Sequence, residues 1–117
     1  MAGTIVEGSI LTETKKMLGL VDEDTTFDTD IIIDINSSLS ILSQLGIGPK
    51  DGYSIKDKND TWDDIIDDAK NLELIKTWLY MKVRLMFDPP LNGTVLNSMN
   101  SQLNELEWRI SVAQHLD

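Results

Sequence analysis

The acidic stretch DKNDTWDDIIDD, residues 57–68, holds the densest cluster of side chains that could do chemistry. Closely spaced carboxylates are typical of calcium-binding loops, which require glycine at the sixth position and glutamate at the twelfth. Counted from Asp57, those positions hold Trp62 and Asp68, and the acidic stretch that begins at Asp22 fails the same test. The pattern therefore favours a solvated acidic helix start over a metal site. We expect no bound metal and no cofactor.

Paired carboxylates can also act as general acid and general base, as they do in glycosidases. Here they cluster at what reads as an exposed helix start, and no pocket is implied there. The one histidine is His115, near the C-terminal end, and the chain contains no cysteine. The sequence has no phosphate-binding loop and no nucleophile elbow. We predict that the protein is not an enzyme.

The distribution of charge limits the classes of partner. The formal net charge is −10, and residues 20–68 account for all of it, with thirteen acidic and three basic residues. Binding to a phosphate backbone needs a basic patch, and the sequence shows none. An acidic surface repels DNA, keeps a protein soluble or binds a basic partner.

Length and composition indicate one folded domain over residues 1–117. Of the 117 residues, 41% are hydrophobic and 26% are charged, which is enough apolar material for a core. No apolar run reaches the roughly 20 residues of a membrane span. The N-terminus lacks the basic start and apolar stretch of a secretory signal. We expect a cytosolic protein without a membrane segment.

The spacing of apolar residues predicts an all-α fold of roughly four to five helices. Three consecutive isoleucines, Ile31 to Ile33, favour a strand locally, but the longer helical spacing through Leu39 and Leu42 decides for a helix. The expected helices cover residues 9–18, 30–45, 61–69 and 71–87 and the chain from residue 94 onward. A Gly-rich loop over residues 46–60 separates the second helix from the third. Loops of that length in compact domains tend to have a function or to move.

The helix over residues 71–87 has more apolar residues than the core of a small bundle needs. Besides its main row it carries a second apolar row, made of Leu74, Trp78, Met81 and Leu85. The last helix has one narrow packing seam, and Trp108 and Val112 lie off it. Because tryptophan is a common anchor of protein interfaces, we predict a subunit interface from the second row together with Trp108 and Val112. Core packing stays the alternative for each tryptophan.

A sharp turn joins the two long C-terminal helices. It consists of Phe87, Asp88, Pro89 and Pro90. Proline lacks the backbone N–H and disfavours helical geometry in the residue before it, so the helix cannot continue through this stretch. We expect the turn to set the two helices at a defined angle.

These motifs, in this order, resemble the small head–tail connector, or adaptor, proteins of long-tailed bacteriophages and prophages. The resemblance is carried by YMKVRLMFDPPLNG and LNELEWRI, and by FDTDIIIDINSSLSILSQLGIGP followed by TWDDII. Proteins of that family end with an apolar helix, a Phe-Asp-Pro-Pro turn and a helix that contains Glu-Leu-Glu-Trp-Arg. The matching residues are 87–90 and 105–109, and the resemblance covers nearly the whole chain.

The resemblance implies an all-α ring of about twelve subunits, docked beneath the portal protein at the capsid vertex. Such a ring continues the DNA channel, lets DNA pass without specific binding, and offers a platform for the next head-completion or tail protein. The implied location is the head–tail junction of the virion, after assembly in the bacterial host cytoplasm. No catalytic or cofactor residue is implied.

Two further sets of residues gain an expected role from the resemblance. The loop over 46–60 becomes a candidate segment that orders against the portal or tail protein, through Gly48, Pro49, Gly52 and Tyr53. The acidic segment becomes a face toward the channel or toward solvent, made of Asp63, Asp64, Asp67 and Asp68. The alternative function is a small acidic regulator, such as a nucleic-acid mimic that binds a basic protein. If the protein is such a regulator, we expect a monomer or dimer. If it is a connector, we expect a high-order ring.

Overall fold

The computed structural model describes residues 6–49, 51–65 and 71–115. Helices are the only regular elements in these residues, and they confirm the predicted all-α class. They are α1 (Ile10–Met17), α2 (Asp28–Gln44), the short 3-10 helix η1 (Trp62–Asp64), α3 (Leu72–Phe87) and α4 (Gly93–His115). Of the helix expected over residues 61–69, the described residues form only η1. Residues 66–69 lie outside the described residues.

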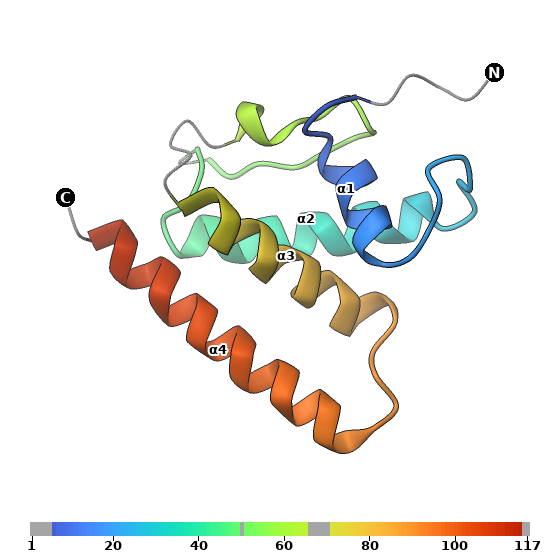
Figure 1. The fold of residues 1–117 in the computed structure, drawn as a ribbon. Coiled ribbons are helices and arrows are strands. Elements are labelled where there is room, and N and C mark those ends of the chain that lie inside the picture. Colours follow the sequence, from blue (N-terminus) through green and yellow to red (C-terminus); the bar gives the residue numbers. More distant parts are fainter. Residues whose placement is uncertain (1–5, 50, 66–70, 116–117) are drawn as a thin grey trace.

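Helix α3 is the central element of the fold (Figure 1). It packs against α2 and α1 on one side and against α4 on the other, and α1 also contacts α2. The core is formed where these helices meet. Its buried side chains include Ile10 and Leu11 of α1, Ile31, Ile35, Leu39 and Leu42 of α2, Trp62 of η1, Ile75, Trp78, Leu79 and Val83 of α3, and Leu103 and Ile110 of α4.

The central position of α3 corrects one expectation from the sequence. The side chain of Trp78 is fully buried, and its Nε1 donates a hydrogen bond to Oε1 of Glu107 on α4 at 3.0 Å. The other members of the second row, Leu74, Met81 and Leu85, are half-buried and pack against the same core. A helix enclosed on two sides needs apolar residues around most of its circumference. Trp78 thus belongs to the core of the single chain and is not a surface residue, while an interface role of the half-buried Leu74, Met81 and Leu85 stays a prediction.

Polar contacts also fasten α1 to α3. The Tyr80 hydroxyl donates to Oε1 of Glu13 at 2.9 Å, and the Lys76 ammonium lies 3.4 Å from the same oxygen. Burial, together with the hydrogen bond to Glu13, raises the pKa of Tyr80 above its usual range. The same Lys76 lies over the buried ring of Trp62, 5.9 Å from its centroid, which also holds η1 against α3.

Candidate interaction surfaces

The outer side of α4 carries the most exposed aromatic side chain of the described residues. The side chain of Trp108 is 66% exposed, whereas Leu103 and Ile110 of the same helix are buried. At about 100° per residue, Trp108 points roughly 140–160° away from these two residues, almost opposite the core. Val112, one turn further along, is half-buried on the same side. The structure thus brings together these two of the six predicted interface residues on one face.

The residues around Trp108 on this outer face are small or uncharged. Asn97, Ser101 and Asn104 are all exposed there. The one charged pair is Glu105 with Arg109, whose atoms lie 2.8 Å apart one helical turn from each other. Both side chains of this pair are more than half exposed, so it contributes little to the stability of the chain. The face can therefore be covered by a partner with little desolvation cost.

The turn between α3 and α4 is fixed at both ends. The backbone of Asp88 leaves the helical region, with φ −149° and ψ 69°, as expected for a residue before proline. The side chain of Asn92 then caps α4, because its Oδ1 accepts hydrogen bonds from the N–H groups of Thr94 and Val95 at 2.8 and 3.2 Å. The predicted start of this helix at residue 94 did not include the cap, although Asn before Gly-Thr is a recognisable signal for it.

An aromatic contact fastens the same turn to α2. The ring of Phe87 packs edge-on against the ring of Phe27, with the centroids 5.6 Å apart. Phe27 precedes the first residue of α2, so the motif residue Phe87 connects the end of α3 to the start of α2. Exposed apolar side chains continue beyond it, and Leu91 is fully exposed. Sequence reasoning missed Phe27 because no local pattern pairs it with a residue 60 positions away.

The described part of the Gly-rich loop is held by hydrogen bonds within the chain. The Asn36 side chain on α2 accepts from the N–H of Ile55 at 2.7 Å and donates to its carbonyl at 3.1 Å. The Asp60 carboxylate accepts from the N–H groups of Lys56 and Asp57 and from the hydroxyl of Tyr53. Burial and the negative charge of Asp60 raise the pKa of Tyr53 to about 12. These contacts hold the described part of the loop in one conformation, and its docking to the portal or tail protein stays a prediction.

The candidate docking residues differ in their positions in this loop. Gly48 and Pro49 are exposed, whereas Gly52 and Tyr53 are half-buried. Gly48 has φ +87°, and a Cβ added there would lie 3.3 Å from a side-chain atom of Ile65. A bulkier residue at Gly48 would therefore strain the fold as well as any docking contact. Docking is better tested at Pro49, whose side chain is exposed and has no hydrogen-bonding group. Its carbonyl accepts from the N–H of Gly52 at 2.9 Å, and a substitution of the side chain leaves that acceptor in place.

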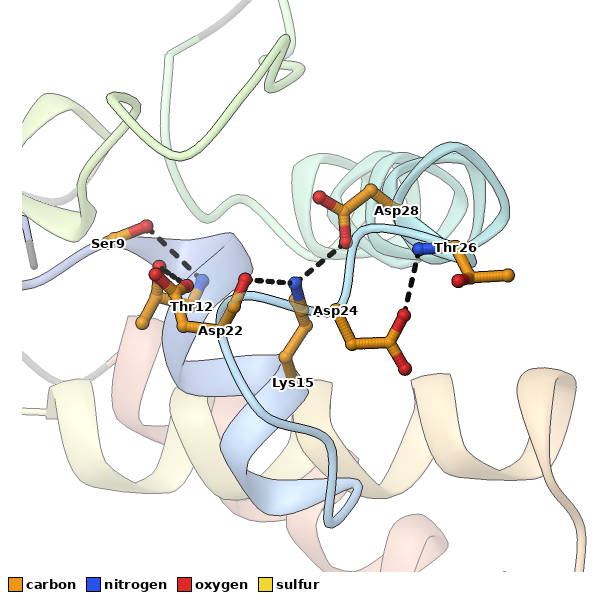
Figure 2. A network of polar contacts seen from close by, with 7 residues as sticks. All are labelled: Ser9, Thr12, Lys15, Asp22, Asp24, Thr26 and Asp28. Atoms are coloured by element: carbon orange, nitrogen blue, oxygen red, sulfur yellow. Dashed lines mark hydrogen bonds and ion pairs between the residues drawn. The ribbon is translucent and has the colours of Figure 1, made fainter. Parts of the chain in front are cut away.

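A buried lysine organises the acidic turn between α1 and α2 (Figure 2). The Lys15 side chain is 2% exposed, and its ammonium lies 2.9 Å from Oδ1 of Asp28 and donates to the carbonyl of Asp22 at 2.9 Å. The Thr12 hydroxyl donates to the carboxylate of Asp22 at 3.0 Å. Hydrogen bonds from the side chain and the N–H of Thr26 lower the pKa of the exposed Asp24. The acidic turn is thus held in one conformation against α1.

Replacing Lys15 with alanine should destabilise the protein by about 3 kcal/mol, because the partly buried Asp28 carboxylate would lose its counter-charge. Urea unfolding of the variant measures this loss. Lys16→Ala is the matched control, since Lys16 is exposed on the same helix and forms none of these contacts, and it should change the stability by less than about 0.5 kcal/mol. Equal effects of both substitutions would contradict the role assigned to Lys15.

The predicted acidic face is only partly described. Asp63 is exposed, and Asp64 caps η1 by accepting hydrogen bonds from the N–H and the hydroxyl of Thr61 at 3.0 and 3.2 Å. Asp67 and Asp68 lie outside the described residues. Asp64 thus has a local structural role, while Asp63 is free to face solvent or a channel.

The described residues contain no group of three or more His, Asp or Glu side chains placed to hold a metal ion. A cavity of about 220 Å³ beside α1 is lined by Asp22, Asp28 and Asp57, but the Lys15 ammonium already supplies the positive charge there. A groove of about 660 Å³ between α2 and residues 51–54 is lined by serine, asparagine and glutamine side chains and by Asp51 and Tyr53. None of the described helices has the length and hydropathy needed to cross a membrane.

Comparison with known proteins gives one match. The model of a family described as "Phage connector protein" matches residues 10–117, which include all four α-helices of the described structure. Neither the curated proteins nor the solved structures gave a match.

Proposed function

The chain belongs to the phage connector protein family, and from this premise we propose that it is a head–tail connector whose subunits close into a ring beneath the portal protein. The ring contains about twelve subunits and extends the DNA channel of the capsid vertex. Its distal side is a platform for the next head-completion or tail protein. The protein resides at the head–tail junction of the virion after assembly in the host cytoplasm.

The exposed face around Trp108 is the observation that supports assembly. A tryptophan that is 66% exposed on an ordered helix is a typical interface anchor, because it buries a large apolar area at a low cost in side-chain entropy. Its small, uncharged neighbours on α4 allow the backbone of a partner to come close. Val112 extends the same contact. Trp78, by contrast, stabilises the subunit itself.

The charge distribution supports passage of DNA without binding. Residues 20–49 contain six acidic and no basic residues, and the network around Lys15 holds part of this stretch in place. An acidic surface repels the phosphate backbone, so a channel wall of this kind lets DNA slide. Asp63 and the other residues of the acidic segment belong either to this wall or to the outer surface of the ring.

Docking to the portal protein tests the proposed function directly. Purified portal of the same phage, mixed with the connector, should give a complex that sediments faster than the portal alone. Substituting the exposed Pro49 by lysine should weaken the complex if the tip of the loop docks there, and Lys16→Ala should leave it unchanged. Failure of the wild-type chain to associate with portal would contradict the proposed function.

A further inference from the structure

The outer side of α2 carries a second exposed apolar side chain. Ile33 is 57% exposed, while Ile31 and Ile35 on the same helix are completely buried. Asp30 is exposed one turn before Ile33, and Asp34 follows it directly. This face, defined by Asp30, Ile33 and Asp34, is therefore an apolar residue flanked by two carboxylates.

The exposed faces of α2 and α4 belong to two helices that α3 separates. Helix α3 packs against both of them (Figure 1). Ile33 is exposed on the side of α2 away from Ile31 and Ile35, and Trp108 is exposed on the side of α4 away from Leu103 and Ile110. A ring needs this geometry, because a heterologous contact joins two different surfaces of each subunit.

The α4 face also offers one cation, Arg109, to the two carboxylates of the α2 face. Asp30 and Asp34 are like charges one helical turn apart, and neither has an ion-pair partner among the described residues. Partial burial and the charge of Asp30 both raise the pKa of Asp34. On α4, the guanidinium of Arg109 is more than half exposed next to Trp108, and its one ion-pair partner there is Glu105. A cation delivered to the Asp30–Asp34 pair would relieve their repulsion.

We propose that the α4 face of one copy, with Trp108 and Arg109, packs on the α2 face of the next copy, with Ile33, Asp30 and Asp34. Trp108 then covers Ile33, and Arg109 pairs with the two carboxylates. This inference rests on the proposed ring and names the surfaces that close it. The helical layers continue across the contact in the order α2, α3, α4, and each step turns by about 30° in a ring of about twelve.

Crosslinking between cysteines introduced on the two faces tests the contact. Because the chain has no native cysteine, only the introduced thiols can react. Ser37→Cys lies one turn from Ile33, and Asn104→Cys lies one turn from Trp108, and both sites are exposed. Neither substitution removes an anchor. An equimolar mixture of the two variants, treated with a short bis-maleimide, should give crosslinked dimers of unlike chains. The double variant should give a ladder of higher species. The pair Lys16→Cys and Asn104→Cys is the control and should not crosslink.

The outcomes separate this contact from the ring itself. Crosslinks within either single variant would mean that like faces meet, and would overturn the inference. Rings of wild-type protein without a crosslink between residues 37 and 104 would overturn the inference and leave the proposed function standing. Absence of any assembly by the wild-type chain, with or without portal, would contradict the ring and the contact together.

Charge reversal gives an independent readout of the same contact. Arg109→Asp should raise the protein concentration at which half of the chains are assembled by about tenfold, because three carboxylates would then meet at the interface. Adding Asp30→Arg in the same chain should restore assembly. If the second substitution does not rescue the first, Arg109 does not meet the α2 face.

Discussion

Replacing Trp108 with alanine is expected to abolish ring formation and to leave the fold of the subunit intact. The side chain is 66% exposed and lies opposite the buried side of α4, so its removal exposes little buried surface in the single chain. Interface anchors of this kind cost about 2 kcal/mol or more when truncated. Each subunit of a ring takes part in two contacts, and both lose an anchor. Native mass spectrometry should therefore show monomers at concentrations where the wild type is assembled.

Val95→Ala is the matched control for this substitution. Val95 is also an exposed apolar residue of α4, at 47%, but it lies on a different side of the helix from Trp108. It should leave assembly unchanged. Thermal unfolding of both variants should stay within about 1 kcal/mol of the wild type. Rings formed by the Trp108→Ala variant would show that the outer face of α4 is not a subunit contact.

Replacing Trp78 with alanine should affect the fold of the subunit directly, in contrast to Trp108→Ala. It should lower the free energy of unfolding by about 4 kcal/mol. The side chain is fully buried between α3 and α4, so truncation leaves a large cavity at the contact of the two helices. It also removes the 3.0 Å hydrogen bond to Glu107. Equilibrium unfolding in urea measures the effect, with the midpoint lowered and the slope unchanged.

Two further variants separate packing from hydrogen bonding at this position. Trp78→Phe keeps most of the apolar volume and should cost about 2 kcal/mol, since the Glu107 carboxylate loses its donor and part of the space is left empty. Glu107→Gln keeps an acceptor and should cost less than either. A Trp78→Ala protein with wild-type stability but without rings would contradict the position of Trp78 in the core and return it to the subunit interface.

Much of the fold follows from local patterns in the sequence. The helical spacing of apolar residues correctly predicted α1, α2, α3 and α4 to within about two residues at their ends. The reasons are local as well. Ser9 caps α1 by accepting a hydrogen bond from the N–H of Thr12, and Pro89 prevents α3 from continuing. Short-range steric and hydrogen-bonding rules act on these positions whatever the tertiary arrangement.

The assignment of faces could not be predicted in the same way. Whether the second row of α3 meets solvent, a partner or another helix depends on how many neighbours α3 has. That number is set by tertiary packing and not by the spacing of Leu74, Trp78, Met81 and Leu85. The burial of Lys15 has the same origin, because its counter-charge comes from Asp28 on another element. Helical spacing alone would have placed Lys15 beside Leu11 on the buried side of α1, but nothing local identifies its partners.

The loop shows a related limit of sequence reasoning. Its length indicated a loop that has a function or moves, and in the described residues Asn36 and Asp60 hold it by hydrogen bonds. Asn36 belongs to α2, 19 residues before Ile55, and pairs with both backbone groups of that residue much as a neighbouring strand would. The Asn36 side chain thus orders a stretch of loop for which composition alone predicts no fixed structure.

Closure of this chain into a ring can be measured by native mass spectrometry of the wild-type protein over a concentration series. Negative-stain images of any large species show whether it is closed. We expect one dominant closed assembly of about twelve subunits, at high concentration or on addition of portal. A chain that stays monomeric or dimeric under both conditions, and that binds a basic protein in a salt-sensitive way, would contradict it and favour an acidic regulator.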